Sequence, residues 1–169
     1  MTKKLLLFLT VLLLTLSLAA CGGPMEQLET LEAPSASSGL EQEPVSPTGF
    51  DGNLAGLCQY MEQNQAVTGE KVEMSYKEIG AVGGFRYRFK FNGSTVQAEF
   101  YEFDLDNQDA KAQECLSSVK EKGFFTILSN EVPAVLNGDF LMVYSDPSKD
   151  EGNTAQAEKV KSLFMDFKQ

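Results

Sequence analysis

The chain has 169 residues, and its 24 Asp and Glu outnumber its 14 Lys and Arg, which gives a formal net charge of −10. A chain this acidic is repelled by the phosphates of nucleic acids, so we expect no nucleic acid partner. The sequence contains no histidine. This excludes catalytic triads built on His and removes the commonest metal ligand.

The first 20 residues predict an export signal. Lys3 and Lys4 form a short basic head, and a largely apolar run follows over residues 5–18. This run is shorter than the roughly 20 residues that span a bilayer. Ala19 and Ala20 then supply the small residues of a cleavage site directly ahead of Cys21. We therefore expect residues 1–20 to be a signal peptide.

The four residues Leu18-Ala19-Ala20-Cys21 resemble the lipobox of bacterial lipoproteins. The resemblance implies that the signal is cut before Cys21 and that a diacylglycerol is attached to the Cys21 thiol. Cleavage would remove two lysines and change the net charge from −10 to −12. Anionic headgroups repel such a chain, so the two acyl chains must supply the attachment. Cys21 is thus predicted to anchor the protein on the cell membrane, facing outside the cytoplasm.

Residues 21–49 predict a disordered stalk. The segment carries four prolines, a serine-rich run at 35–39 and five glutamates, and it has no Lys, Arg or aromatic residue. It can bury too little apolar surface to offset the entropy lost on ordering. Its Gly22-Gly23 start and acidic composition resemble those of small lipoproteins of Gram-positive bacteria. We expect the stalk to end at residue 49 and a single domain to occupy residues 50–169.

The domain is predicted to begin with a helix and a strand. Apolar residues recur at i, i+3, i+4 and i+7 from Leu54 to Met61, which is the spacing of one buried helix face. Asp51 or Asn53 can cap this helix. The hydrophobic period then changes to two over residues 72–77, which indicates a half-buried strand.

The clearest hairpin runs from Phe85 to Phe100 around Asn92-Gly93. This pair is favoured in type I′ turns because both positions need positive φ. Apolar and polar residues alternate, so the hairpin has one apolar and one solvated face. An arginine row there would suit the carboxylates or phosphates of cell-envelope polymers. The alternative is a plain solvated face whose arginines pair with Glu99 and Glu73 across the strands. The candidate binding face comprises Arg86, Arg88, Lys90, Gln97 and Glu99.

The sequence after the hairpin predicts two further helices and three apolar, strand-like segments. A helix is expected from Asp106 or Asn107 to Gly123. Strand-like segments follow at 124–128, 132–136 and 140–144, and a last helix covers about 154–167. The predicted order of elements is α-β-β-β-α-β-β-α. It predicts an α+β fold, a two-layer sandwich in which helices cover one face of an antiparallel sheet of about five strands.

Cys58 and Cys115 lie on apolar helix faces and allow two interpretations. An exported domain can join them in a disulfide. They can equally be buried free thiols that pack as small hydrophobic groups. No Cys-x-x-Cys motif is present, which argues against a redox role.

The sequence indicates no catalytic, metal-binding or cofactor-binding motif. The aspartates at 104–109 and 146–150 lack the spacing of an EF-hand. The glycine-rich residues 80–84 lead into a strand and lack the Lys-Ser/Thr of a phosphate-binding loop. We therefore expect no metal, no cofactor and no enzymatic activity.

Together these features predict a lipid-anchored binding or accessory lipoprotein. Its partners would be the membrane, through the lipid, and a protein or polymer of the cell envelope. Two alternatives stay open. An acidic inhibitor could sequester a basic extracellular protein through its net charge. A carboxylate-dependent hydrolase could use paired acids such as Glu99 and Glu102.

Overall fold

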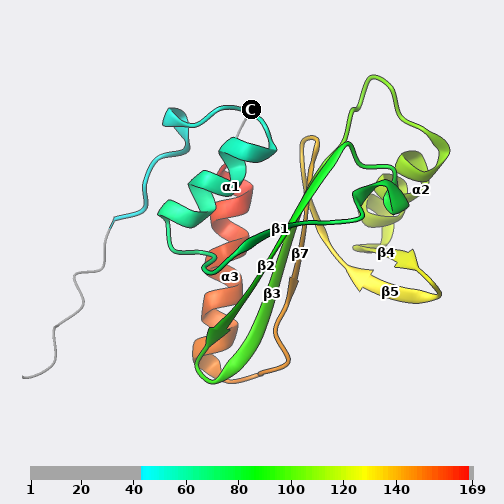
Figure 1. Ribbon diagram of the computed structural model, residues 1–169. Coiled ribbons are helices and arrows are strands. Elements are labelled where there is room, and N and C mark those ends of the chain that lie inside the picture. Colours follow the sequence, from blue (N-terminus) through cyan, green and yellow to red (C-terminus); the bar gives the residue numbers. More distant parts are fainter. Residues whose placement is uncertain (1–42, 168–169) are drawn as a thin grey trace, which may run out of the picture. The chain divides into compact units, whose positions relative to one another are not determined.

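The computed structural model describes residues 43–167, and Figure 1 shows their arrangement. The predicted signal peptide, Cys21 and most of the predicted stalk lie outside these residues. Within residues 43–167, no helix combines the length and the apolar character that a membrane span requires. The elements follow in the order η1 (Pro47–Gly49), α1 (Leu54–Gln63), β1 (Lys71–Glu73), η2 (Tyr76–Ile79), β2 (Gly83–Phe91), β3 (Ser94–Glu102), α2 (Ala110–Lys122), β4 (Phe124–Ile127), β5 (Asn130–Pro133), β6 (Val135–Asn137), β7 (Phe140–Ser145) and α3 (Glu151–Asp166).

Five strands form one antiparallel sheet in the order β1-β2-β3-β7-β6, and β4 and β5 form a separate hairpin. The α+β class confirms the prediction, and so does the order in which the helices alternate with runs of strands. The run between α2 and α3 has four strands instead of two. β3 is the central strand, because β7 returns beside it after α2 and the second hairpin. Side chains of β3 therefore lie in the middle of each face of the sheet.

The β2–β3 hairpin has the turn that its sequence predicts. Asn92 and Gly93 have φ values of 44° and 77°, and Phe91 pairs with Ser94, so the loop is a two-residue type I′ turn. The turn fixes the register of the polar face. The opposed pairs are Arg86 with Glu99, Arg88 with Gln97 and Lys90 with Thr95.

Helices α1 and α3 lie together on one side of the sheet, in agreement with the prediction (Figure 1). Their apolar side chains contact alternate strand residues such as Tyr87, Phe100 and Phe140, each of which is 0% exposed. The rings of Phe100 and Phe164 lie 6.3 Å apart between centroids. Burial of each large side chain contributes about 1.5–3 kcal/mol, so this cluster is a main source of stability.

A second cluster covers the other alternate residues of the sheet. Tyr101, Leu141 and Val143 contact side chains of α2 and β4, among them Cys115 and Phe125. Because side chains alternate along a strand, these three lie on the face opposite the first cluster. Figure 1 shows α2 beside the β4–β5 hairpin, away from α1 and α3. The second cluster buries part of the face that the sequence predicts to be solvated.

Helix α2 begins later than predicted. Its N-cap is Asp109, whose side chain accepts a hydrogen bond from the first turn. Asp104 explains the shift, since its Oδ1 accepts hydrogen bonds from the backbone N–H groups of Asp106 and Asn107 and holds both in a loop. The helix ends as predicted at Gly123, which has a φ of 78°.

Other boundaries also differ from those predicted. Residues 45–49, which the predicted stalk includes, contact the domain: the Val45 N–H donates to Asn64 Oδ1 at 2.7 Å and ties this segment to the end of α1. The predicted strand at 72–77 is split into β1 and the 3-10 helix η2. Helix α3 starts at Glu151, and its Asn153 donates to Asp146 Oδ2 at 2.7 Å, which fixes the helix to the end of β7.

Candidate functional site

A groove of about 620 Å³ lies between the second face of the sheet and the β4–β5 hairpin. The central strands contribute polar and apolar groups, among them Gln97, Glu99 and Val143. η2 and the segment before it add further apolar surface on the sheet side. The hairpin closes the opposite side. The apolar walls comprise Met74, Ile79, Phe125, Ile127, Val132 and Val143.

The principal polar group of the groove is Glu99, which is 7% exposed. Tyr101 Oη donates to Glu99 Oε2 at 2.7 Å, and Gln97 Nε2 donates to Glu99 Oε1 at 2.8 Å. Both oxygens of Glu99 accept a hydrogen bond, which is how an ionised carboxylate bonds. All three residues belong to β3 at successive alternate positions, so the strand itself aligns them.

The network continues across the hairpin to Arg88. Its Nη2 donates to Gln97 Oε1 at 2.8 Å, which fixes the Gln97 amide so that its Nε2 points to Glu99. Arg86 lies opposite Glu99 and is half-buried. Burial raises the pKa of Tyr101, the neighbouring Glu99 charge raises it further, and the charge of Arg86 opposes these effects. The Tyr101 hydroxyl therefore stays protonated and remains a donor to Glu99.

Gly84 makes room for the Tyr101 ring. The two residues are paired across β2 and β3, and a Cβ placed on Gly84 would lie 2.7 Å from the Tyr101 ring. Such a distance is far below van der Waals contact, so a side chain at residue 84 would displace the phenol. The glycine-rich stretch of the sequence thus positions a side chain of the groove.

The structure places the five residues of the predicted binding face on one face, but their environments differ. Arg88 and Lys90 are exposed, and Lys90 Nζ donates to Thr95 Oγ1 at 2.5 Å. The expectation that Glu99 lies on an open surface is wrong, because Glu99 is buried. The suggested pairing of the arginines with Glu73 is also wrong, because Glu73 pairs with Phe85 and lies on the other face.

The sequence patterns do not single out Tyr101 or the hairpin residues as part of a site. For Tyr101 the sequence does carry a signal, because Tyr101 and Phe103 continue the alternation of Gln97 and Glu99. Both aromatic residues are buried, at 5% and 1% exposed. This change from polar to aromatic residues along one face indicates that another element covers the end of the strand. The identity of that element, the β4–β5 hairpin, has no local signal.

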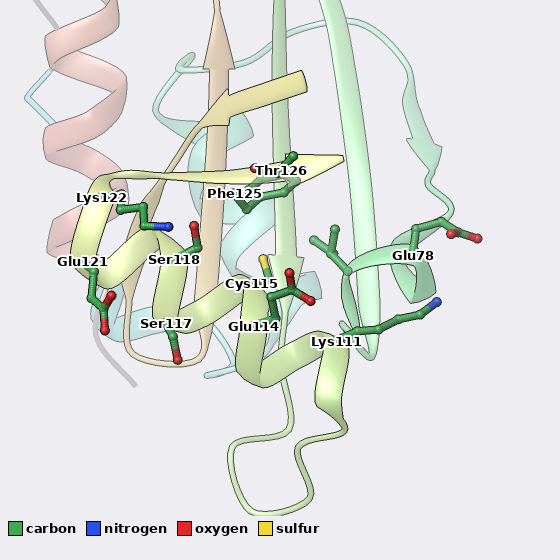
Figure 2. A pocket seen from close by; sticks show the side chains of 11 residues that line it. Glu78, Lys111, Glu114, Cys115, Ser117, Ser118, Glu121, Lys122, Phe125 and Thr126 are labelled. Carbon is green, nitrogen blue, oxygen red and sulfur yellow. The ribbon is translucent and has the colours of Figure 1, made fainter. Parts of the chain in front are cut away.

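A smaller pocket of about 320 Å³ runs along α2 beside η2 and β4 (Figure 2). Figure 2 shows the side chains of Lys111, Glu114 and Glu121 on the helix and that of Glu78 on η2. Cys115 also lines this pocket, but burial raises the pKa of its thiol to about 12. A protonated thiol is a poor nucleophile, so we prefer the larger groove as the candidate site.

The two cysteines are free thiols in the described part of the chain. Cys58 belongs to the cluster under α1, and Cys115 belongs to the cluster under α2. The sheet lies between these clusters, so a disulfide would require both to unpack. Burial also raises the pKa of the Cys58 thiol to about 11. Of the two interpretations that the sequence allows, this structure has the buried free thiols.

The other acidic candidates have structural roles. Asp146 accepts hydrogen bonds from the Asn153 side chain and from the Ser148 N–H. No group of three or more His, Cys, Asp or Glu residues that could hold a metal ion occurs within residues 43–167. Glu99 and Glu102 lie on opposite faces of β3, and Glu102 Oε2 accepts a hydrogen bond from the Leu54 N–H at 3.3 Å. That pair of carboxylates cannot act on one glycosidic bond.

Tyr144 lies at the border between the groove and a third pocket of about 390 Å³ beside α3. Its hydroxyl is buried and has no hydrogen-bond partner within the residues that the structure describes. Burial raises the pKa of this phenol to about 12, with a further contribution from the charge of Asp146. The hydroxyl is therefore a protonated, unsatisfied donor inside the domain.

No protein-family model, no curated protein and no solved structure matches this chain.

Proposed function

We propose that this protein is a lipid-anchored binding lipoprotein that holds a small ligand in the groove between the sheet and the β4–β5 hairpin. The observation that carries the proposal is the combination of apolar walls with one buried, oriented carboxylate, Glu99. Small-molecule sites typically occupy about 300–1,000 Å³ and have few, well-positioned polar groups in mostly apolar surroundings. The groove, at about 620 Å³, has these properties.

The polar network supports binding over catalysis. The Tyr101 hydroxyl and the Gln97 amide are both committed to Glu99, and Arg88 holds Gln97 in place. Such an arrangement orients a ligand without reorganising when the ligand enters. The Cys115 thiol lines the smaller pocket along α2 and not this groove, so it supplies no nucleophile here.

The location of the domain is proposed from the N-terminal sequence. The Leu18-Ala19-Ala20-Cys21 motif supports lipidation of Cys21 and attachment to the outer face of the cell membrane. A domain held there by a stalk would meet molecules of the cell envelope and the medium. The groove would then take its ligand from outside the cytoplasm.

The proposal is tested by obstructing the groove. We would express residues 21–169 with Cys21→Ser, which removes the proposed site of lipid attachment. Amide signals would be followed by NMR during titration with 4-phenylbutylamine, 4-phenylbutanol and 4-phenylbutyrate. Ser145 lines the groove and is exposed, so Ser145→Trp should fill it without disturbing the core. The matched control is Thr95→Trp, which adds the same ring to the same face of the sheet outside the groove.

We expect at least one probe to shift the amides of Gln97, Val132 and Val143 in the parent chain and in Thr95→Trp. The same shifts should be lost in Ser145→Trp. Failure of all three probes to shift these amides would contradict the proposed function, as would equal binding by the Ser145→Trp chain.

A further inference from the structure

We infer that the groove selects an organic cation, with an ammonium or guanidinium group at Glu99 and an apolar group against the β4–β5 hairpin. This inference rests on the proposed function, because it names the chemical class of ligand for the same groove. It goes against the first expectation from the sequence, in which a row of arginines would bind an anion.

The bonding of Glu99 leaves room for a cationic donor. A carboxylate has about four lone-pair sites, and Gln97 and Tyr101 occupy two of them. Both donors are neutral, so they orient the carboxylate without cancelling its charge. A buried charge is costly unless it is paired. A ligand ammonium that reached Glu99 would fill the remaining sites and add a positive charge on the groove side, beside the one that Arg86 supplies from β2.

The charged residues around Glu99 also favour a cationic ligand. Three further acidic residues, Glu78, Glu131 and Asp146, line the groove together with one basic residue, Lys149. Carboxylates inside a groove with low-dielectric walls concentrate a negative potential there. An anion would meet this potential at the entrance, whereas a cation is attracted by it.

The arginines of the sheet do not reverse this balance. Arg86 and Arg88 belong to β2 and are not among the residues that line the groove. Arg88 is committed to Gln97 through the hydrogen bond of 2.8 Å. Arg86 faces Glu99 from the neighbouring strand, and its charge acts on the Tyr101 phenol. It reduces the negative potential from the side of β2, and it does not line the groove.

The hairpin provides the matching apolar surface. Phe125, Ile127 and Val132 project from β4 and β5 and line the groove, and Ile127 and Val132 are half-buried. Half-buried apolar groups gain further burial when a ligand covers them. A ligand with a cationic head and an apolar body thus satisfies both sides of the groove.

The three probes of the titration share one apolar body and differ in the charge of the head group. We expect 4-phenylbutylamine to bind the Cys21→Ser chain at least tenfold more tightly than 4-phenylbutanol and 4-phenylbutyrate. Because this comparison uses the parent groove, it does not depend on whether a variant folds. Equal binding of the alcohol, or tighter binding of the butyrate, overturns the cation preference and leaves the proposed function standing. No binding by any probe overturns both.

A second measurement assigns the preference to Glu99. Glu99→Gln keeps the size of the side chain and removes its charge, so we expect the amine to lose at least tenfold in affinity while the alcohol changes less than twofold. The matched control is Glu73→Gln, which removes the charge of an exposed residue at the edge strand β1, outside the groove. Equal losses in both variants would show a general effect of net charge and would overturn the role of Glu99.

Discussion

The hydroxyl of Tyr101 donates to Glu99 Oε2 at 2.7 Å, and the two residues are separated by one position on β3. A pair at i and i+2 on a strand shares one face, so this contact needs no long-range rearrangement. What makes it important is burial, since the two residues are 5% and 7% exposed. A buried carboxylate that loses a donor keeps its full desolvation cost.

Replacing Tyr101 by Phe should lower the free energy of unfolding. The change removes the donor to Glu99 and keeps the ring that packs in the second cluster. Hydrogen bonds to charged groups contribute about 1.5–3 kcal/mol, so we expect a loss of that size in urea unfolding. A Tyr101→Phe protein as stable as the parent would show that Glu99 does not depend on this bond.

Replacing Tyr144 by Phe, in contrast, should not lower the free energy of unfolding. The Tyr144 hydroxyl is buried without a hydrogen-bond partner among residues 43–167, so Tyr144→Phe removes an unsatisfied group. We expect the free energy of unfolding to stay the same or to rise by up to about 1 kcal/mol. Tyr144→Phe thus serves as the matched control for Tyr101→Phe. A clear loss of stability would mean that this hydroxyl has a partner, such as a bound water.

The two cysteines should make stability fall at alkaline pH. Burial raises the pKa of Cys58 from 9.0 to about 11 and that of Cys115 from 9.0 to about 12. The folded protein therefore holds protons that the unfolded chain releases above pH 9. The contribution of these thiols is complete below pH 9 and is lost as the pH rises toward 11 and 12. Urea unfolding from pH 8 to 10.5 should show the decline, and a Cys58→Ala, Cys115→Ala protein should show a shallower one. If stability falls equally steeply with pH in both proteins, the cysteines are not the cause of the decline.

Arg86 and Arg88 should respond differently to reversal of charge. Arg86→Glu would place a second carboxylate directly opposite the buried Glu99, and like charges in that position destabilise a sheet. We expect it to lower the free energy of unfolding by about 1 kcal/mol or more. Arg88 is exposed, so Arg88→Glu should change the free energy of unfolding by about 0.5 kcal/mol or less. Equal effects of the two substitutions in thermal unfolding would contradict the different environments of the two arginines.

The proposed lipid anchor predicts how Cys21 affects processing. In a bacterial expression host, replacing Cys21 by Ser should leave an unlipidated precursor with a higher polypeptide mass, because the proposed lipobox would lack its modified residue. Mass spectrometry of the membrane fraction measures both changes. Unchanged processing and membrane retention in the Cys21→Ser protein would contradict lipidation.

The sequence by itself determined the local elements of this domain. Asn92-Gly93 specifies the type I′ turn because both positions adopt positive φ, and the alternation of polar and apolar residues then assigns Arg86 and Glu99 to one face. Gly123 likewise ends α2 in the left-handed conformation. These features depend on residues that are neighbours in the chain, so the pattern that specifies them is visible without the fold.

Only the tertiary structure decided what covers each face. Alternation assigns Glu99 and Tyr101 to the same face, but it does not state that α2 and the β4–β5 hairpin return to bury that face. Nor does it place Cys58 and Cys115 in clusters on opposite sides of the sheet. Such contacts join segments far apart in the chain, and they form where the packing of many apolar groups is best satisfied together. The groove, its buried carboxylate and the separation of the two thiols all follow from that packing.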